Sequence, residues 1–116
     1  MEKNVEISML CQIYGKVLTE KQYEVLNDYY NNDLSLSEIA ENNNITRQAV
    51  RDIIKKSENK LYELEKNIGF MKKSFEEEKI VNEIINSLDE LKKDLTSSKK
   101  SDKIINQIKK QLNQII

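Results

Sequence analysis

The stretch LSLSEIAENNNITRQAVRDIIKK, residues 34–56, has a helix-start signal on each side of three consecutive asparagines. Ser35 is followed three residues later by Glu38, which is the capping-box pattern of a helix N-terminus, and Thr46 can cap a second helix. Two helices that cross steeply need a residue in the left-handed region between them, and asparagine is the best choice after glycine. We therefore predict a helix-turn-helix with Asn44 at its turn.

Hydrophobic residues flank both caps at the spacing of a hydrophobic staple. Leu34 precedes the first cap and Ile39 follows it, and Ile45 and Val50 repeat this arrangement around Thr46. An ordinary polar loop could also contain three asparagines, but a cap and a staple on each side are not expected of it. The first of the two helices is only about two turns long, so it needs a packing partner to be stable.

The residues before this stretch predict two further helices. Between residues 5 and 18, apolar residues recur at steps of three and four, the period of an amphipathic helix, although Gly15 weakens the last turn. Thr19 and Gln22 form another capping-box pattern, so a second helix is expected from Glu20. We expect this helix to bury three large side chains, Tyr23, Leu26 and Tyr30.

Helical patterning continues after the motif. Gly69 marks a bend or break, and an apolar stripe resumes over residues 75–95. A turn is predicted over residues 96–101, followed by a last helix whose apolar residues at 104–116 lie on one side. The two stripes can be covered by folding into an antiparallel pair or by packing against a second copy. We favour a homodimer, because the tail is longer than a small core can cover and because a dimer would pair two motifs.

The overall composition limits the function classes. With 116 residues the chain can form one domain with a helical appendage, and we predict an all-α fold. The helix-turn-helix domain is expected over residues 1–66, and the helical C-terminal extension over residues 67–116. The net charge is −1, so any binding of nucleic acid must come from a local cluster of basic side chains.

The sequence contains no arrangement of residues that indicates catalysis or a cofactor. There is no histidine, and Cys11 is the single cysteine, which excludes an intrachain disulfide and metal sites built from these residues. We find no acid–base pair, phosphate-binding loop or activated nucleophile, and predict a non-enzymatic protein without cofactors. No apolar run approaches the ~20 residues of a membrane span, and the first residues lack the apolar core of a signal peptide. These features predict a cytoplasmic protein without membrane insertion.

The second helix of the motif would present polar side chains to solvent, because its period turns the apolar residues inward. On the outward face, Gln48 has the geometry to read adenine, and Arg47 or Arg51 could read guanine in a major groove. Lys55 and Lys56 suit phosphate groups. The predicted nucleic-acid-binding set also takes in hydroxyl side chains near the two helix N-termini and one outward aspartate, and comprises Ser35, Ser37, Thr46, Arg47, Gln48, Arg51, Asp52, Lys55 and Lys56.

The stretch SLSEIAENNNITRQAVRDIIKKSENKL resembles the helix-turn-helix of sigma-factor region 4. With YGKVLTEKQYEVLNDYY before it, the sequence also resembles the YlxM family of small bacterial proteins over residues 5–75, most specifically in LTEKQ, SLSEIA and TRQAVRD. Asn43 departs from the motif, which usually has a large apolar residue there, so we expect looser packing under the turn. YlxM-like proteins are typically encoded beside components of the signal recognition particle. The resemblance therefore implies a role in that pathway, with components of the particle as partners.

Two functions are consistent with these residues. The first is a regulatory role in which the basic face binds DNA or RNA. The second is that of a non-enzymatic accessory protein, which docks onto protein or RNA of the signal recognition particle through the tail or through the same face. A third interpretation of the basic face is simply that of a solvated helix surface.

Overall fold

The computed structural model describes residues 1–94 and 99–116, and all regular secondary structure in these residues is helical. The all-α prediction is therefore confirmed. The chain divides into two compact units, Met1–Met71 and Lys72–Ile116. The domain boundary expected after residue 66 stays a prediction. The helices are α1 (Lys3–Tyr14), a short 3-10 turn η1 (Gly15–Val17), α2 (Glu20–Tyr30), α3 (Leu36–Asn43), α4 (Arg47–Ile68), α5 (Phe70–Asp94) and α6 (Lys99–Asn113).

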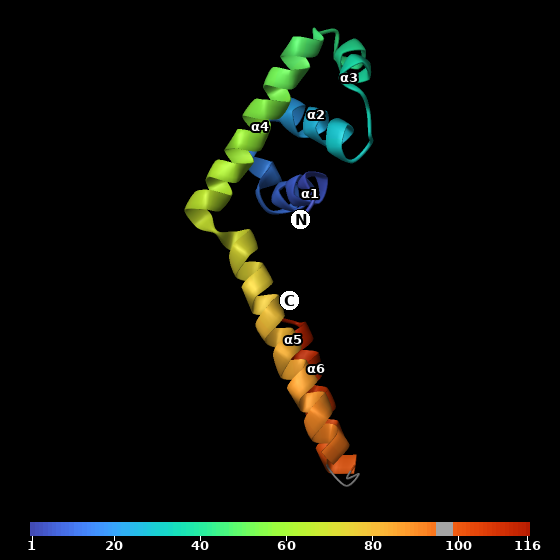
Figure 1. Cartoon of the computed structure of the whole chain (residues 1–116), viewed down its shortest axis with the longest axis vertical. Helices are drawn as coiled ribbons and strands as arrows, with labels where there is room; N and C mark the ends of the chain where they lie inside the picture. The colour runs from blue at the N-terminus through green and yellow to red at the C-terminus, as the bar shows by residue number, and fades with distance from the viewer. Residues whose placement is uncertain (95–98) are drawn as a thin grey trace. The chain divides into compact units, whose positions relative to one another are not determined.

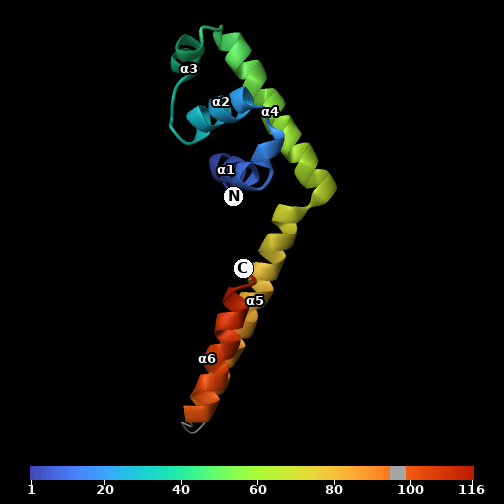
Figure 2. The ribbon, with the colours of Figure 1, turned by 180° about the vertical axis from the view of Figure 1, so that it is seen from behind.

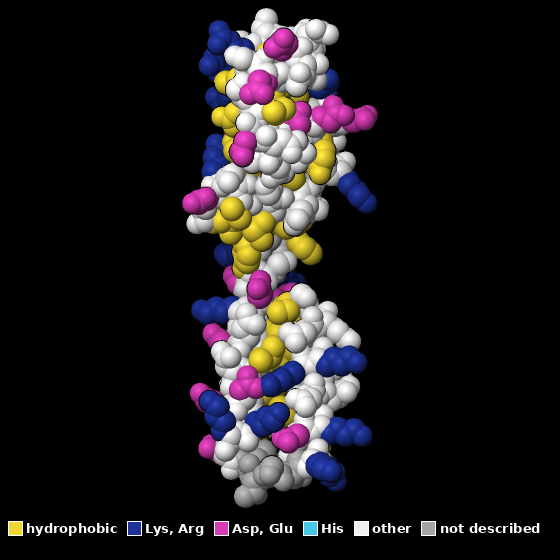
Figure 3. Space-filling view, turned by 90° about the vertical axis from the view of Figure 1, so that its right-hand side faces the viewer, with side chains coloured by type: hydrophobic (Ala, Val, Ile, Leu, Met, Phe, Trp, Pro, Cys, Tyr) yellow, Lys and Arg dark blue, Asp and Glu magenta, His cyan; other side chains and the backbone are white. Residues whose placement is uncertain are grey.

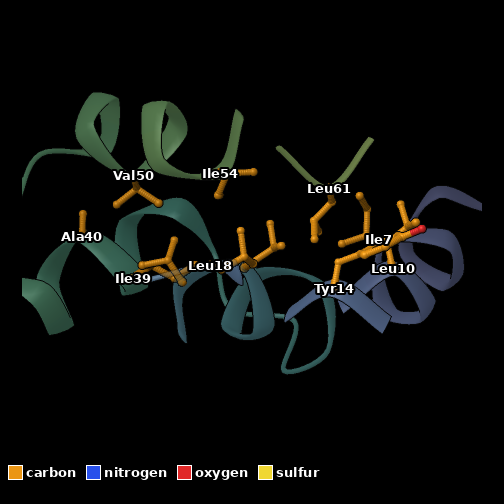
Figure 4. Close-up of a cluster of buried hydrophobic side chains, with 11 residues drawn as sticks. Ile7, Leu10, Tyr14, Leu18, Ile39, Ala40, Val50, Ile54 and Leu61 are labelled. Carbon is orange, nitrogen blue, oxygen red and sulfur yellow. The ribbon is translucent and has the colours of Figure 1, made fainter. Parts of the chain in front are cut away.

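In the first unit, α1, α2 and α3 all pack against the long helix α4 (Figures 1 and 2). Figure 4 shows Val50 and Ile54 of α4 facing Ile39 of α3, and it shows Leu61 farther along α4, facing the side chains of α1. Burying a side chain of this size contributes about 1.5–3 kcal/mol. These contacts supply the partner that the short helix α3 needs. The buried cluster consists of Ile7, Leu10, Tyr14, Leu18, Val25, Leu26, Ile39, Ala40, Val50, Ile54 and Leu61.

The three predicted helix starts are confirmed by their hydrogen bonds. Thr19 and Gln22 form a complete capping box, and so do Ser35 and Glu38. The backbone N–H of Ala49 donates to Thr46 Oγ1 at 3.0 Å. Each cap satisfies a backbone donor that has no partner inside its own helix.

The turn between α3 and α4 has the predicted left-handed residue. Asn44 has φ 54° and ψ 42°, and the N–H of Ile45 donates to the carbonyl oxygen of Ala40 at 3.1 Å. Asn43 is half-buried, and its amide replaces the apolar contact usual at this position with two hydrogen bonds. It donates to the Ile39 carbonyl at 2.8 Å and accepts from Lys21 Nζ at 2.6 Å. The turn is thus held by polar contacts.

The prediction that Tyr23 of α2 is buried in the core is wrong. Tyr23 is 45% exposed, whereas Val25, which the pattern did not single out, is fully buried. The ring of Tyr23 lies against Gly15, where an added Cβ would come within 3.2 Å of it. A tyrosine at this position therefore covers the surface of the 3-10 turn instead of entering the core.

The break expected at Gly69 is confirmed, because α4 ends there with φ 69°. Beyond it, the first N–H groups of α5 find side-chain partners. Phe70 N–H donates to the Tyr14 hydroxyl at 3.3 Å, and Met71 N–H donates to Glu65 Oε1 at 2.9 Å. The Tyr14 hydroxyl in turn donates to Glu65 Oε1 at 2.8 Å. These bonds satisfy two backbone donors in the first turn of α5, where no partner within the helix exists.

In the second unit, α5 and α6 run antiparallel, side by side in both ribbon views (Figures 1 and 2). Val81 and Ile105 are buried there, and an ion pair between Lys109 and Asp89 joins the two helices. The two stripes therefore cover each other in part within one chain.

Two predictions for the tail are wrong at least in part: the single apolar side of the last helix and the extent of the turn before it. The apolar residues of the last helix do not share one side, since within α6 Ile105 is 4% exposed but Ile104 is 52% exposed. Neighbours in a helix point about 100° apart, so Ile104 and Ile105 cannot both face α5. The turn was predicted over residues 96–101, but residues 99–101 already belong to α6. Residues 96–98 and the end of the stripe at residue 95 lie outside the described part of the chain.

Candidate nucleic-acid interface

The outward face of α4 carries the predicted binding side chains on a rigid support. Val50 on the opposite face is fully buried and Ile54 is 7% exposed, so α4 is held by its inner side. All nine predicted site residues are exposed to solvent. Seven of them lie at Thr46 or in the first half of α4, whereas Ser35 and Ser37 lie at the start of α3, at the other end of that helix from the turn. Figure 3 shows Lys and Arg side chains along one edge of the unit that contains α1 to α4.

Four basic side chains on this face have no protein partner. Arg47, Arg51, Lys55 and Lys56 make no hydrogen bond or ion pair with any residue in the described part of the chain, and we name them the α4 cations. An unpaired cation needs no internal contact to be broken before it can hold a phosphate group. The α4 cations are therefore available to an anionic ligand.

Gln48 and Asp52 engage each other one helical turn apart. Gln48 Nε2 donates to Asp52 Oδ1 at 3.1 Å. The carboxylate holds the amide in one orientation, but it also occupies one of the two groups that would read adenine. Gln48 must exchange this bond to read a base with both groups, and Asp52 offsets part of the positive charge.

The hydroxyl groups near the helix N-termini differ in whether they already make hydrogen bonds within the protein. Ser35 and Thr46 each use the side-chain oxygen to accept a backbone N–H, which leaves the hydroxyl hydrogen able to donate to a phosphate. Ser37 makes no hydrogen bond with a described residue. The N-terminus of α3 already holds the Glu38 carboxylate, whereas α4 has no acidic residue in its first turn. The N-terminus of α4 is therefore the better place for an anion.

A buried acidic residue beside this face was not anticipated. Glu58 is 9% exposed, forms an ion pair with Lys3 at 3.2 Å and accepts a hydrogen bond from the Tyr30 hydroxyl. Burial, followed by this hydrogen bond, raises the pKa of Tyr30, so its phenol stays protonated and keeps donating. The periodicity of α4 places Glu58 on the inner side, but its partners on α1 and α2 are too distant in sequence for any local pattern to reveal.

Among the described residues, no three cysteine or acidic side chains lie close enough to hold a metal ion. In the same part of the chain, no helix is both long enough and apolar enough to cross a membrane.

Comparison with known proteins places these observations in a family. The family model UPF0122, described as "Putative helix-turn-helix protein, YlxM / p13 like", matches residues 1–112. A UPF0122 protein of Clostridium botulinum is 46% identical over 100 residues, which are 86% of this chain and 89% of the relative. A UPF0122 protein of Clostridium acetobutylicum is 41% identical over 113 residues, 97% of each chain. One of Malacoplasma penetrans is 54% identical over 66 residues, 57% of this chain and 62% of the relative.

Proposed function

The chain belongs to the UPF0122 family of YlxM/p13-like helix-turn-helix proteins, and we propose that it is a regulatory protein that binds nucleic acid through the outward face of α4. The observation that carries this proposal is the set of unpaired α4 cations on one exposed face. The protein as a whole has a net charge of −1, so its overall charge does not attract nucleic acid. Any attraction to phosphate must come from the α4 cations.

The dimensions of the face suit a major groove. An α-helix with its side chains is about 10–12 Å across, which fits the major groove of B-DNA, about 12 Å wide. From Arg47 to Lys56 the helix rises by about 14 Å. The end of α4 that would enter the groove first carries Thr46 and Arg47, which can bind a phosphate and a guanine respectively. Lys55 and Lys56 lie farther along the helix, where they can contact the phosphate backbone.

A second candidate function is docking onto another macromolecule of the signal recognition particle pathway, which the resemblance to YlxM implies. The observation that favours it is apolar surface on the second unit. Ile80, Ile84 and Leu91 of α5 are 54%, 41% and 50% exposed. Figure 3 shows hydrophobic side chains along this unit with charged side chains on both sides. Under both candidates the protein acts in the cytoplasm and without catalysis.

Under the first candidate function, we propose that a second copy of the chain covers this surface; under the second, the docked macromolecule takes its place. Two α5 helices related by a two-fold axis perpendicular to their length run antiparallel, and such an interface must be complementary to itself. Crossing level with residue 86, they would place Ile80 of one copy close to Leu91 of the other, and Ile84 close to Leu88. Replacing Ile84 by Glu should lower the mass measured by light scattering from that of a dimer to that of a monomer. A wild-type protein that is monomeric at high concentration would refute the dimer.

The test of nucleic-acid binding combines selection with a matched pair of variants. The protein would be mixed with random DNA duplexes and with RNA, and the retained molecules sequenced. Arg51→Ala with Lys55→Ala should lose the enrichment obtained with wild type, since a base contact is worth about 1–3 kcal/mol. The control, Lys79→Ala with Lys93→Ala, removes the same amount of charge from exposed positions of α5. This variant should enrich the same molecules as wild type. No enrichment by wild type, together with retention of particle protein, would favour docking.

A further inference from the structure

Beside the outward face of α4, the first unit contains a hollow of about 440 Å³, a volume within the range of small-ligand sites. Its lining comes from four helices that are far apart in sequence. We call it the tyrosine hollow, and it is lined by Lys3, Tyr29, Tyr30, Leu36, Arg51, Ile54, Lys55, Glu58 and Asn59.

The charge in the tyrosine hollow is positive. Its one acidic residue, Glu58, has both carboxylate oxygens engaged, one by Lys3 at 3.2 Å and the other by the Tyr30 hydroxyl. Arg51 and Lys55 have no partner among the described residues, so their charge is not compensated. A ligand that fits this balance carries negative charge on the side facing α4.

The remainder of the hollow is aromatic and apolar. Tyr29 is 36% exposed and packs edge-to-face on Tyr30, with ring centroids 5.0 Å apart and an interplanar angle of 88°. The hydrogen bond from the Tyr30 hydroxyl to Glu58 holds the Tyr30 ring in place, so Tyr29 packs against a ring of fixed position. Leu36 and Ile54 add aliphatic surface. A flat aromatic group can therefore stack here without any rearrangement of the core.

A cationic edge beside an exposed aromatic ring matches the chemistry of one nucleotide. We propose that the tyrosine hollow receives an unpaired nucleotide, with its base against Tyr29 and its phosphate against Arg51 and Lys55. Asn59 is exposed at the rim and offers an amide donor and acceptor to the edge of the base. This inference rests on the proposed function and narrows it, because the preferred ligand becomes a duplex with an unpaired nucleotide next to the segment bound by α4.

The wild-type protein tests the proposal directly. Matched duplexes of DNA and of RNA would be titrated with and without one bulged 2-aminopurine, a fluorescent base whose emission falls when it stacks. The bulged duplex should bind about tenfold more tightly, since stacking of a base on an aromatic side chain has an effect of this order. Its emission should fall on binding. Adenosine monophosphate, titrated alone, distinguishes a site for a free nucleotide from one within a strand.

Variants on α2 assign the effect to the ring. Tyr29→Ala should bring the ratio of the two affinities to about one and abolish the fall in emission, whereas Tyr29→Phe keeps the ring and should keep both effects. Tyr23→Ala removes another exposed tyrosine of the same helix, outside the hollow, and should change neither. Wild-type protein that binds bulged and paired duplexes equally, without a change in emission, would overturn the proposal while leaving duplex binding intact. Absence of binding to every duplex and RNA would refute the proposed function itself.

Discussion

Replacing Thr46 by Ala removes the cap on which the second helix of the motif depends. The Thr46 side chain accepts the backbone N–H of Ala49 at 3.0 Å, and α4 has no other side-chain cap at this end. Without the hydroxyl, the N–H of Ala49 can only be satisfied by water. The first turn of α4 is then free to fray, although the rest of the helix remains anchored through Val50, Ile54 and Leu61.

The size of the effect follows from the length of the first unit. Loss of an N-cap costs about 1 kcal/mol. At about 2.1 cal/mol/K per residue, the 71 residues of Met1–Met71 have an unfolding entropy of about 150 cal/mol/K. We therefore expect Thr46→Ala to lower the melting temperature of this unit by about 7 °C. The oligomeric state should not change, because Thr46 is not among the residues of the proposed dimer contact.

Tyrosine provides a selective signal for this measurement. All five tyrosines lie between residues 14 and 62, and the chain has no tryptophan, so near-ultraviolet circular dichroism from tyrosine reports on the first unit. Thr46→Ser keeps the capping oxygen and should melt within about 2 °C of wild type. If Thr46→Ala melts at the wild-type temperature, the cap contributes nothing. If the melting temperature of Thr46→Ser falls as far as that of Thr46→Ala, the lost methyl group is responsible and the capping argument fails.

Three further predictions concern other parts of the fold. Ile105→Ala should cost about 2–5 kcal/mol in the free energy of unfolding of the second unit, whereas Ile104→Ala, at the exposed position next to it, should cost far less; equal losses in urea denaturation would contradict the packing of α5 on α6. Asn44→Ala should destabilise the turn by about 1 kcal/mol and Asn44→Gly should not, because only the alanine is strained at positive φ; melting temperatures that do not separate the two variants would argue against this. Because the pKa of Tyr30 is raised above its ordinary value of 10.0, its contribution to stability is present below pH 10 and is lost as the pH rises further. The free energy of unfolding should thus fall above pH 10, less steeply in Tyr30→Phe, and parallel curves for the two proteins would refute this.

The sequence predicted those parts of the fold that depend on neighbouring residues. Caps at Thr19, Ser35 and Thr46, and the left-handed turn at Asn44, are decided by side chains within three or four positions, so their patterns are readable. The outward orientation of the α4 cations follows from the helical period.

Features that depend on distant residues were not predicted. The contact between Tyr30 and Glu58 joins residues 28 positions apart, and the tyrosine hollow exists only once four helices meet. Helical spacing alone predicts Tyr23 in the core, but the neighbouring Gly15 gives its ring a place at the surface. In α6, only one of the adjacent residues Ile104 and Ile105 can face inward, and the packing of α6 on α5 determines that it is Ile105.

The salt dependence of binding tests the role of the α4 cations most directly. The affinity for a selected duplex would be measured at several salt concentrations for wild type, for Arg51→Ala with Lys55→Ala, and for the control Lys79→Ala with Lys93→Ala. If both removed side chains hold phosphates, the slope of log K against log salt should become less negative by about 1.8, since each phosphate contact contributes about 0.9. The control should retain the wild-type slope. The same slope and affinity for all three proteins would contradict nucleic-acid binding by this face of α4.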